Sequence, residues 1–174
     1  MKSFKYTDDT DRSYGAAGMA IGLMVFDGEE TLSSITLDGD PNDMVVLSPD
    51  FYFAGNPAVS AKSVWNQMLK NYNISLGMLM SNFLCRHIVN GKHNLPSELR
   101  DFLHQLAREE GHEICSLDDD EIDSLFDKNF NYLNRVFAHR GVQSVARDFA
   151  ETLLKRRTLS RLEVLELLDA LKSL

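Results

Sequence analysis

Large apolar side chains recur every three or four positions over most of the chain after Pro57, which is the spacing of one helical face. The clearest example runs from residue 116 to residue 139, where a helix of about six turns is predicted. Its apolar face consists of Ile122, Leu125, Phe126, Phe130, Leu133, Val136 and Phe137. A face this wide has to be covered, and the helical segments before and after it have apolar faces that can cover it.

The sequence also predicts where this helix begins and ends. Ser116 is a suitable N-cap, and the acidic residues 118–121 favour the positive end of the helix dipole. Arg135 and His139 lie near the negative end, where cations are favourable. We expect Gly141 to end the helix.

Five further helical segments are predicted after Pro57. Their apolar faces span residues 61–72, 76–88, 99–106, 142–154 and 162–171. Breaks are expected at residues 71–73, at Asn90-Gly91 and at Gly111. Because the connections are short, successive helices should pack as near-antiparallel neighbours.

The first 55 residues follow a different pattern. The apolar run from Gly15 to Phe26 contains three glycines, each of which costs a helix about 1 kcal/mol relative to alanine. The run fits a buried helix with a close-packing glycine face, or a strand that ends at the turn of residues 27–28. Residues 31–37 favour a strand, and a hairpin through residues 27–30 would pair it with residues 19–26. Residues 44–47 and 51–53 are two further short β-like runs.

These patterns predict a mainly α fold, a compact bundle of about six helices with a small N-terminal antiparallel β element (α+β). We expect a single domain over residues 1–174. Within it, we expect a flexible start at residues 1–13, a β-containing region at 14–55 and a helical region at 57–174.

Charge and cysteine content narrow the function classes. The net charge of −8 argues against general binding to nucleic acid or to anionic membranes, so we expect no partner of either kind. The apolar run 16–26 is too short to span a bilayer and lacks the flanks of a signal peptide. Cys85 and Cys115 are expected to be buried free thiols, which favours a cytoplasmic protein.

No metal or cofactor is expected. Residues 38–43 begin like a calcium loop, but Asp43 stands where the sharp turn needs glycine, and Pro49 stands where a bidentate Glu belongs. None of the five histidines forms the i, i+4 pair of a zinc-binding helix.

Motifs for catalysis or DNA recognition are also weak. The chain has no nucleophile elbow, phosphate loop or dinucleotide fingerprint, and Cys115 near His112 is a thin basis for a thiol enzyme. The last two helical segments are joined by a short turn at residues 157–159, as in a helix-turn-helix motif. However, the second carries Glu163, Glu166 and Asp169 on its polar face, which would repel phosphate. Catalytic residues therefore stay unassigned, and a non-enzyme is favoured.

The most irregular stretch spans residues 48–67. Its three consecutive aromatic residues cannot all face one way in an extended chain, so Tyr52 needs cover from the fold or from a partner. The stretch fits a loop anchored over the core, or a ligand groove lined by Tyr52, Asn56, Trp65 and Asn66.

Two functions remain open. The first is a non-catalytic protein-interaction module that binds a partner protein or associates with itself as a homodimer. It depends on the last helical segment, which has more apolar residues than one buried face needs: Leu162, Val164, Leu165, Leu167, Leu168, Leu171 and Leu174. The alternative is a small-molecule-binding protein or enzyme with a pocket around residues 48–67.

Overall fold

The computed structural model describes residues 5–52 and 61–174, and their elements confirm the predicted α+β class. The α-helices in these residues are α1 (Asp9–Val25), α2 (Ala61–Leu84), α3 (Ser97–Cys115), α4 (Asp119–Ala138), α5 (Arg140–Arg156) and α6 (Arg161–Leu168). The strands are β1 (Leu32–Thr36), β2 (Val45–Leu47) and β3 (Thr158–Ser160). Shorter turns are η1 (Glu29–Thr31), η2 (Pro41–Asp43), η3 (Pro49–Tyr52), the π-helical η4 (Cys85–Asn90) and η5 (Asp169–Ser173).

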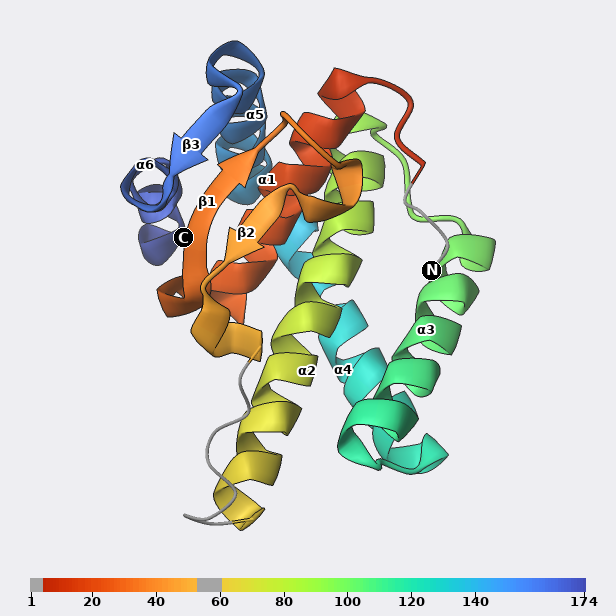
Figure 1. Cartoon of the computed structure of the whole chain (residues 1–174). Helices are drawn as coiled ribbons and strands as arrows, with labels where there is room; N and C mark the ends of the chain where they lie inside the picture. Colours follow the sequence, from red (N-terminus) through yellow and green to blue (C-terminus); the bar gives the residue numbers. More distant parts are fainter. Residues whose placement is uncertain (1–4, 53–60) are drawn as a thin grey trace.

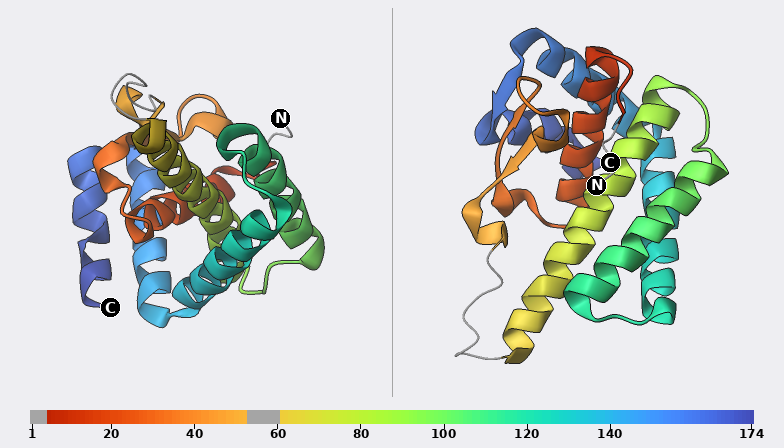
Figure 2. Two further views of the ribbon diagram at one scale, coloured as in Figure 1. Left: turned by 90° about the horizontal axis from the view of Figure 1, so that it is seen from below. Right: turned by 45° about the vertical axis from the view of Figure 1, so that its right-hand side comes forward.

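Helix α1 lies at the centre of the molecule, with the sheet crossing one of its faces (Figure 1). It packs against α2 on one side and against α5 on another. Helices α3 and α4 both pack on α2, so α2, α3 and α4 form a group of their own beside α1 (Figure 2). None of the described helices is both long and apolar enough to cross a bilayer.

Residues 15–25 lie in α1, so the glycine-faced helix is the correct alternative and the predicted hairpin with residues 31–37 is wrong. The glycines allow close contact with α2. A Cβ on Gly18 would lie 2.2 Å from the carbonyl oxygen of Ser81, and one on Gly22 would lie 2.4 Å from Ser81 Oγ. The helix also begins earlier than expected, because the Asp8 side chain accepts a hydrogen bond from the backbone N–H of Asp11.

The sheet has β1 as its central strand, paired antiparallel with β2 and β3. Strand β2 lies within residues 44–47, so the strand predicted there is confirmed. Strand β3 lies where the sequence predicts only a helix junction, and the Thr36 and Thr158 hydroxyls are 2.9 Å apart across its pairing with β1. The sheet therefore joins the two ends of the chain.

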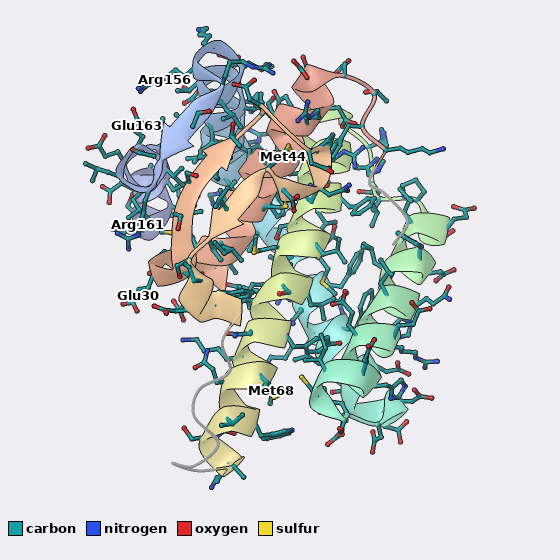
Figure 3. All side chains as sticks on the ribbon, viewed as in Figure 1. Glu30, Met44, Met68, Arg156, Arg161 and Glu163 are labelled. Carbon is teal, nitrogen blue, oxygen red and sulfur yellow. The ribbon has the colours of Figure 1, made fainter. Side chains whose placement is uncertain are left out.

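The two arginines that precede β3 both form ion pairs. Arg157, just before the strand, has a φ of +67° and places its guanidinium on Asp9 at 2.7 Å and on Asp38 at 3.1 Å. Arg156 pairs with Glu163 of α6, and both side chains are labelled in Figure 3. The basic residues before β3 therefore pair with carboxylates of α1, of the β1–β2 connection and of α6.

The strand predicted over residues 51–53 is wrong for Phe51 and Tyr52, which lie in η3, while Phe53 lies outside the described residues. Phe51 is buried, and its carbonyl oxygen accepts a hydrogen bond from Asn71 Nδ2 at 2.6 Å. This contact ties η3 to α2.

Helix α2 runs without interruption through residues 71–73, where a break was expected. The polar groups there have partners on neighbouring helices. The Tyr72 hydroxyl donates to the carbonyl oxygen of Ala107 at 2.7 Å, and Asn73 Oδ1 accepts from Asn129 Nδ2 at 2.6 Å. These bonds stabilise the helical conformation that the local sequence disfavours. Two of the predicted helices, over residues 61–72 and 76–88, are therefore one continuous element that begins with α2. The described residues still contain six α-helices, because α1 is an additional one.

The apolar face predicted for α4 is confirmed: Ile122, Phe126, Phe130, Leu133 and Phe137 are buried. The predicted ends need correction. Asp118 is the N-cap, in a capping box with Glu121, whereas Ser116 is the C-cap of α3 with a φ of +53°. Two glycines also differ from expectation: Gly111 is buried inside α3, and Gly141 lies in the first turn of α5.

Candidate functional site

The residues predicted as a ligand site are only partly described. Trp65 is 43% exposed, and its indole N–H donates to the carbonyl oxygen of Cys115 at 3.1 Å, which links α2 to the end of α3. Asn66 is exposed on α2. Asn56 and the side chain of Tyr52 lie outside the described residues. A site formed by these four residues therefore stays a prediction.

A groove of about 300 Å³ lies between α1, α4, α5 and η5, and we call it the C-terminal groove. Its apolar lining consists of Ile21, Val25, Val136, Val142, Leu171 and Leu174. Three polar or amphipathic residues complete it: Tyr132, Arg135 and His139. No local sequence pattern predicts this site, because its walls come from segments far apart in the chain.

Helix α4 forms one wall of the C-terminal groove. Tyr132, Arg135, Val136 and His139 are spaced i, i+3, i+4 and i+7, which places all four on one helical face. Helix α1 forms the floor, since Ile21 is fully buried. The groove is therefore built on packed helices, which hold its shape.

The apolar surface of the groove is accessible. Tyr132 is 46% exposed and Leu174 is 58% exposed, and both are among the most exposed large apolar side chains of the described residues. Leu174 approaches α5 at Gly141, where a Cβ would lie 2.7 Å from Leu174 Cδ2. Exposed apolar side chains around a concave surface are typical of a binding site.

Two basic residues line the same groove. Nδ1 of His139 accepts a hydrogen bond from the backbone N–H of Gly141 at 3.1 Å, so the proton of the neutral ring is on Nε2, which can donate to a ligand. His139 therefore caps α5, in addition to its predicted place at the end of α4. Arg135 has no hydrogen bond or ion pair to residues 5–52 or 61–174. Its charge is available to a partner.

The histidines suggested for chemistry have structural partners. His112 bonds through Nδ1 to the Leu117 carbonyl oxygen at 2.8 Å and through Nε2 to Asp119 at 2.7 Å, so neither nitrogen is free to activate Cys115. Cys115 is buried, and burial raises the pKa of its thiol. This geometry argues against the thiol-enzyme alternative.

A second histidine pairs with a carboxylate between α3 and α4. His104 Nε2 lies 2.6 Å from Asp123 Oδ1, and Arg108 contacts both carboxylate oxygens at 2.9 and 2.6 Å. These hydrogen bonds, that of Arg108 first, lower the pKa of Asp123 to about 2. His104 and Arg108 both lie on α3, so their contacts with Asp123 join α3 to α4, which is a structural role.

Cys85 and Cys115 are both free and buried, as the sequence predicts. Burial also raises the pKa of the Cys85 thiol, which favours an inert side chain. In the part of the chain that the structure describes, no group of three or more His, Cys, Asp or Glu side chains is placed to hold a metal ion.

The chain was compared with models of protein families, with curated proteins and with solved structures, and nothing matches.

Proposed function

We propose that this protein is a non-catalytic protein-interaction module whose partner inserts a large apolar side chain into the C-terminal groove. The observation that carries the proposal is the exposure of Tyr132 and Leu174 around a concave apolar surface. Interfaces place a few large anchors in such pockets, and these anchors supply most of the binding energy. The volume of about 300 Å³ is at the lower end for a ligand pocket and suits one or two side chains.

Charge suggests the chemistry of the partner. The chain has a net charge of −8, yet the described residues that line the groove include the basic side chains of Arg135 and His139 and no carboxylate. An acidic residue next to the apolar anchor would pair with Arg135, which has no partner in the described part of the chain. The favoured partner is a protein segment in which Asp or Glu flanks a large apolar side chain.

Self-association remains a separate prediction with a narrower basis. Val164 and Leu168 are buried within the chain, and Leu165, Leu167 and Leu171 are partly buried. Leu162, at 66% exposed, and Leu174 are the remaining exposed leucines of that segment. A dilution series followed by light scattering tests for a homodimer.

The proposal includes a cytoplasmic location, which the two free thiols favour. The alternative function is that of a small-molecule binder or enzyme with a pocket around residues 48–67. Of the side chains predicted to line that pocket, the structure describes Trp65 and Asn66. A thermal-shift screen against metabolites, with Asn66→Ala as the variant, tests it.

Fluorescence polarisation with a panel of labelled peptides tests the main proposal. The panel holds Leu, Phe or Trp flanked by Glu, and the same anchors flanked by Lys. We expect Glu-flanked peptides to bind more tightly, and Tyr132→Ala or Arg135→Glu to weaken binding about 30-fold, the size of a hot-spot contribution of about 2 kcal/mol.

Ile114→Ala and Lys155→Glu are matched controls, since Ile114 is 44% exposed and neither residue lines the groove. Both should bind like the wild type. If no peptide of the panel binds, or if the Tyr132 and Arg135 variants bind as well as these controls, the groove is not the interaction site.

A further inference from the structure

A second cavity, of about 320 Å³, lies between α5 and the segment that joins η4 to α3. We call it the basic pocket. Its polar lining consists of Lys92, His93, Asn94, Gln143 and Arg147, and its apolar lining of Ile88 and Val89. None of its lining residues lines the C-terminal groove, so the two sites can be tested separately.

The backbone around η4 builds this pocket. The helix widens into a π-helical turn over residues 85–90, a feature that is frequent at functional sites. The chain then folds back: the N–H of Gly91 donates to Arg86 O at 2.9 Å, and the N–H of His93 donates to His87 O at 3.0 Å. Lys92, between them, has a φ of +56°, which is uncommon for a residue other than glycine.

Hydrogen bonds orient the polar lining. His93 Nδ1 lies 3.0 Å from the carbonyl oxygen of Asn94, so the ring donates its Nδ1–H to this acceptor. Gln143 Nε2 donates to the carbonyl oxygen of Phe137 at 2.9 Å. Gln143 lies four residues before Arg147 in α5, so the two residues are on the same helical face. The polar side chains of the pocket therefore lie on a loop that hydrogen bonds hold in place, residues 92–94, and on helix α5.

The charges in the pocket are uncompensated. Lys92 and Arg147 have no hydrogen bond or ion pair to any residue that the structure describes, and Glu151, one turn beyond Arg147, does not pair with it. Other cations of the chain do have carboxylate partners, such as Arg86 on Asp11 and Arg108 on Asp123. Among the described residues, no carboxylate lines the pocket, although the chain has 26 acidic and 18 basic residues.

We propose that the basic pocket binds the phosphate monoester group of a small molecule. The two unpaired cations match the nearly two negative charges that a phosphate monoester carries at neutral pH. The planar fork of Arg147 can hold two phosphate oxygens, and Lys92 supplies a second positive charge. The Asn94 amide is a neutral donor beside them, and Ile88 and Val89 offer an apolar surface to the rest of the ligand.

Isothermal titration calorimetry with phenyl phosphate tests this proposal, with inorganic phosphate and acetate as comparison ligands. We expect phenyl phosphate to bind more tightly than inorganic phosphate, and acetate to bind more weakly than both. Binding should weaken as salt is raised from 0.02 to 0.2 M, since the pocket is open to solvent. Vesicles containing phosphatidic acid form a further arm, and binding to them but not to phenyl phosphate would assign the site to a membrane lipid.

Arg147→Gln and Lys92→Gln should each weaken phenyl phosphate binding at least tenfold, and circular dichroism should show that both variants are folded. Arg140→Gln is the matched control, because Arg140 is exposed on the same helix and does not line the pocket. The proposal is overturned if phenyl phosphate does not bind at millimolar concentration. It is also overturned if both pocket variants bind as tightly as the Arg140 control.

Discussion

Replacing Gly18 with alanine tests whether α1 and α2 pack as closely as the structure shows. A Cβ at this position would lie 2.2 Å from the carbonyl oxygen of Ser81 and 2.7 Å from Cys85 Cβ. Because carbon and oxygen rarely approach closer than about 3.3 Å, the two helices would have to separate by about 1 Å. The nearest atom belongs to the backbone of α2, so no side-chain rotation can relieve the contact.

The expected loss of stability follows from two opposing effects. Overpacking a core costs about 1–3 kcal/mol, and we expect the upper value because a backbone atom is in the way. Alanine in place of glycine inside a helix gains about 1 kcal/mol. The free energy of unfolding should therefore fall by about 2 kcal/mol, which lowers Tm by about 4–8 °C for a chain of this size.

Urea unfolding followed by circular dichroism measures this loss, and a double-mutant cycle shows its origin. Gly22→Ala would place a Cβ 2.4 Å from Ser81 Oγ and 2.8 Å from Ser81 Cβ, which are side-chain atoms, and 2.9 Å from the Gly77 carbonyl oxygen, so its two shortest contacts are with a side chain. Ser81→Gly should therefore recover about 1 kcal/mol in the Gly22 variant and nothing in the Gly18 variant. A Gly18→Ala protein as stable as the wild type would refute the close packing of α1 on α2.

Three further predictions concern buried charge, helix capping and pH. Arg86 and Asp11 form an ion pair at 2.6 Å, and both side chains are about 10% exposed. Arg86→Met should lower the free energy of unfolding, measured in urea, by about 3–5 kcal/mol, because it leaves the buried Asp11 carboxylate without its cation. A loss under 1 kcal/mol would contradict this. Asp118→Ala should lower the free energy of unfolding by about 1 kcal/mol, because Asp118 is the N-cap of α4. Ser116→Gly should leave it unchanged, since Ser116 has a φ of +53°, which glycine adopts readily. The reverse order of thermal stabilities would show that Ser116 is the N-cap. The pKa of Asp123 is lowered to about 2, so its stabilising effect is complete above about pH 4 and is lost as the pH falls to about 2. The stability difference between wild type and Asp123→Asn should therefore shrink over that range in acid unfolding curves, and a constant difference would show that the ion pair does not form.

The sequence by itself determined the elements whose signal is local. The apolar residues of α4 recur every three or four positions, and only a helix places residues with this spacing on one side. This spacing predicts that Phe126, Leu133 and Phe137 are core residues, and they are buried. The spacing of the glycines in α1 likewise predicts a close-packing face if the segment is a helix. Short β-rich runs such as residues 44–47 also follow from local composition.

Tertiary structure decided what depends on distant partners. The choice of helix over strand for residues 15–25 comes from contact with α2, because the loss of helix propensity at each glycine is offset by close packing on Ser81. Strand β3 exists because β1 offers unpaired backbone groups to a three-residue segment with no strand pattern of its own.

The same reason applies to the two cavities. The C-terminal groove joins residues of α1, α4 and η5, and the basic pocket joins the loop after η4 to α5, so neither has a motif along the chain. The sequence supplied the amphipathic helices, because their periodicity is a local property. Only their packing decided which side chains remain exposed around a concave surface, because exposure depends on residues far away in the chain.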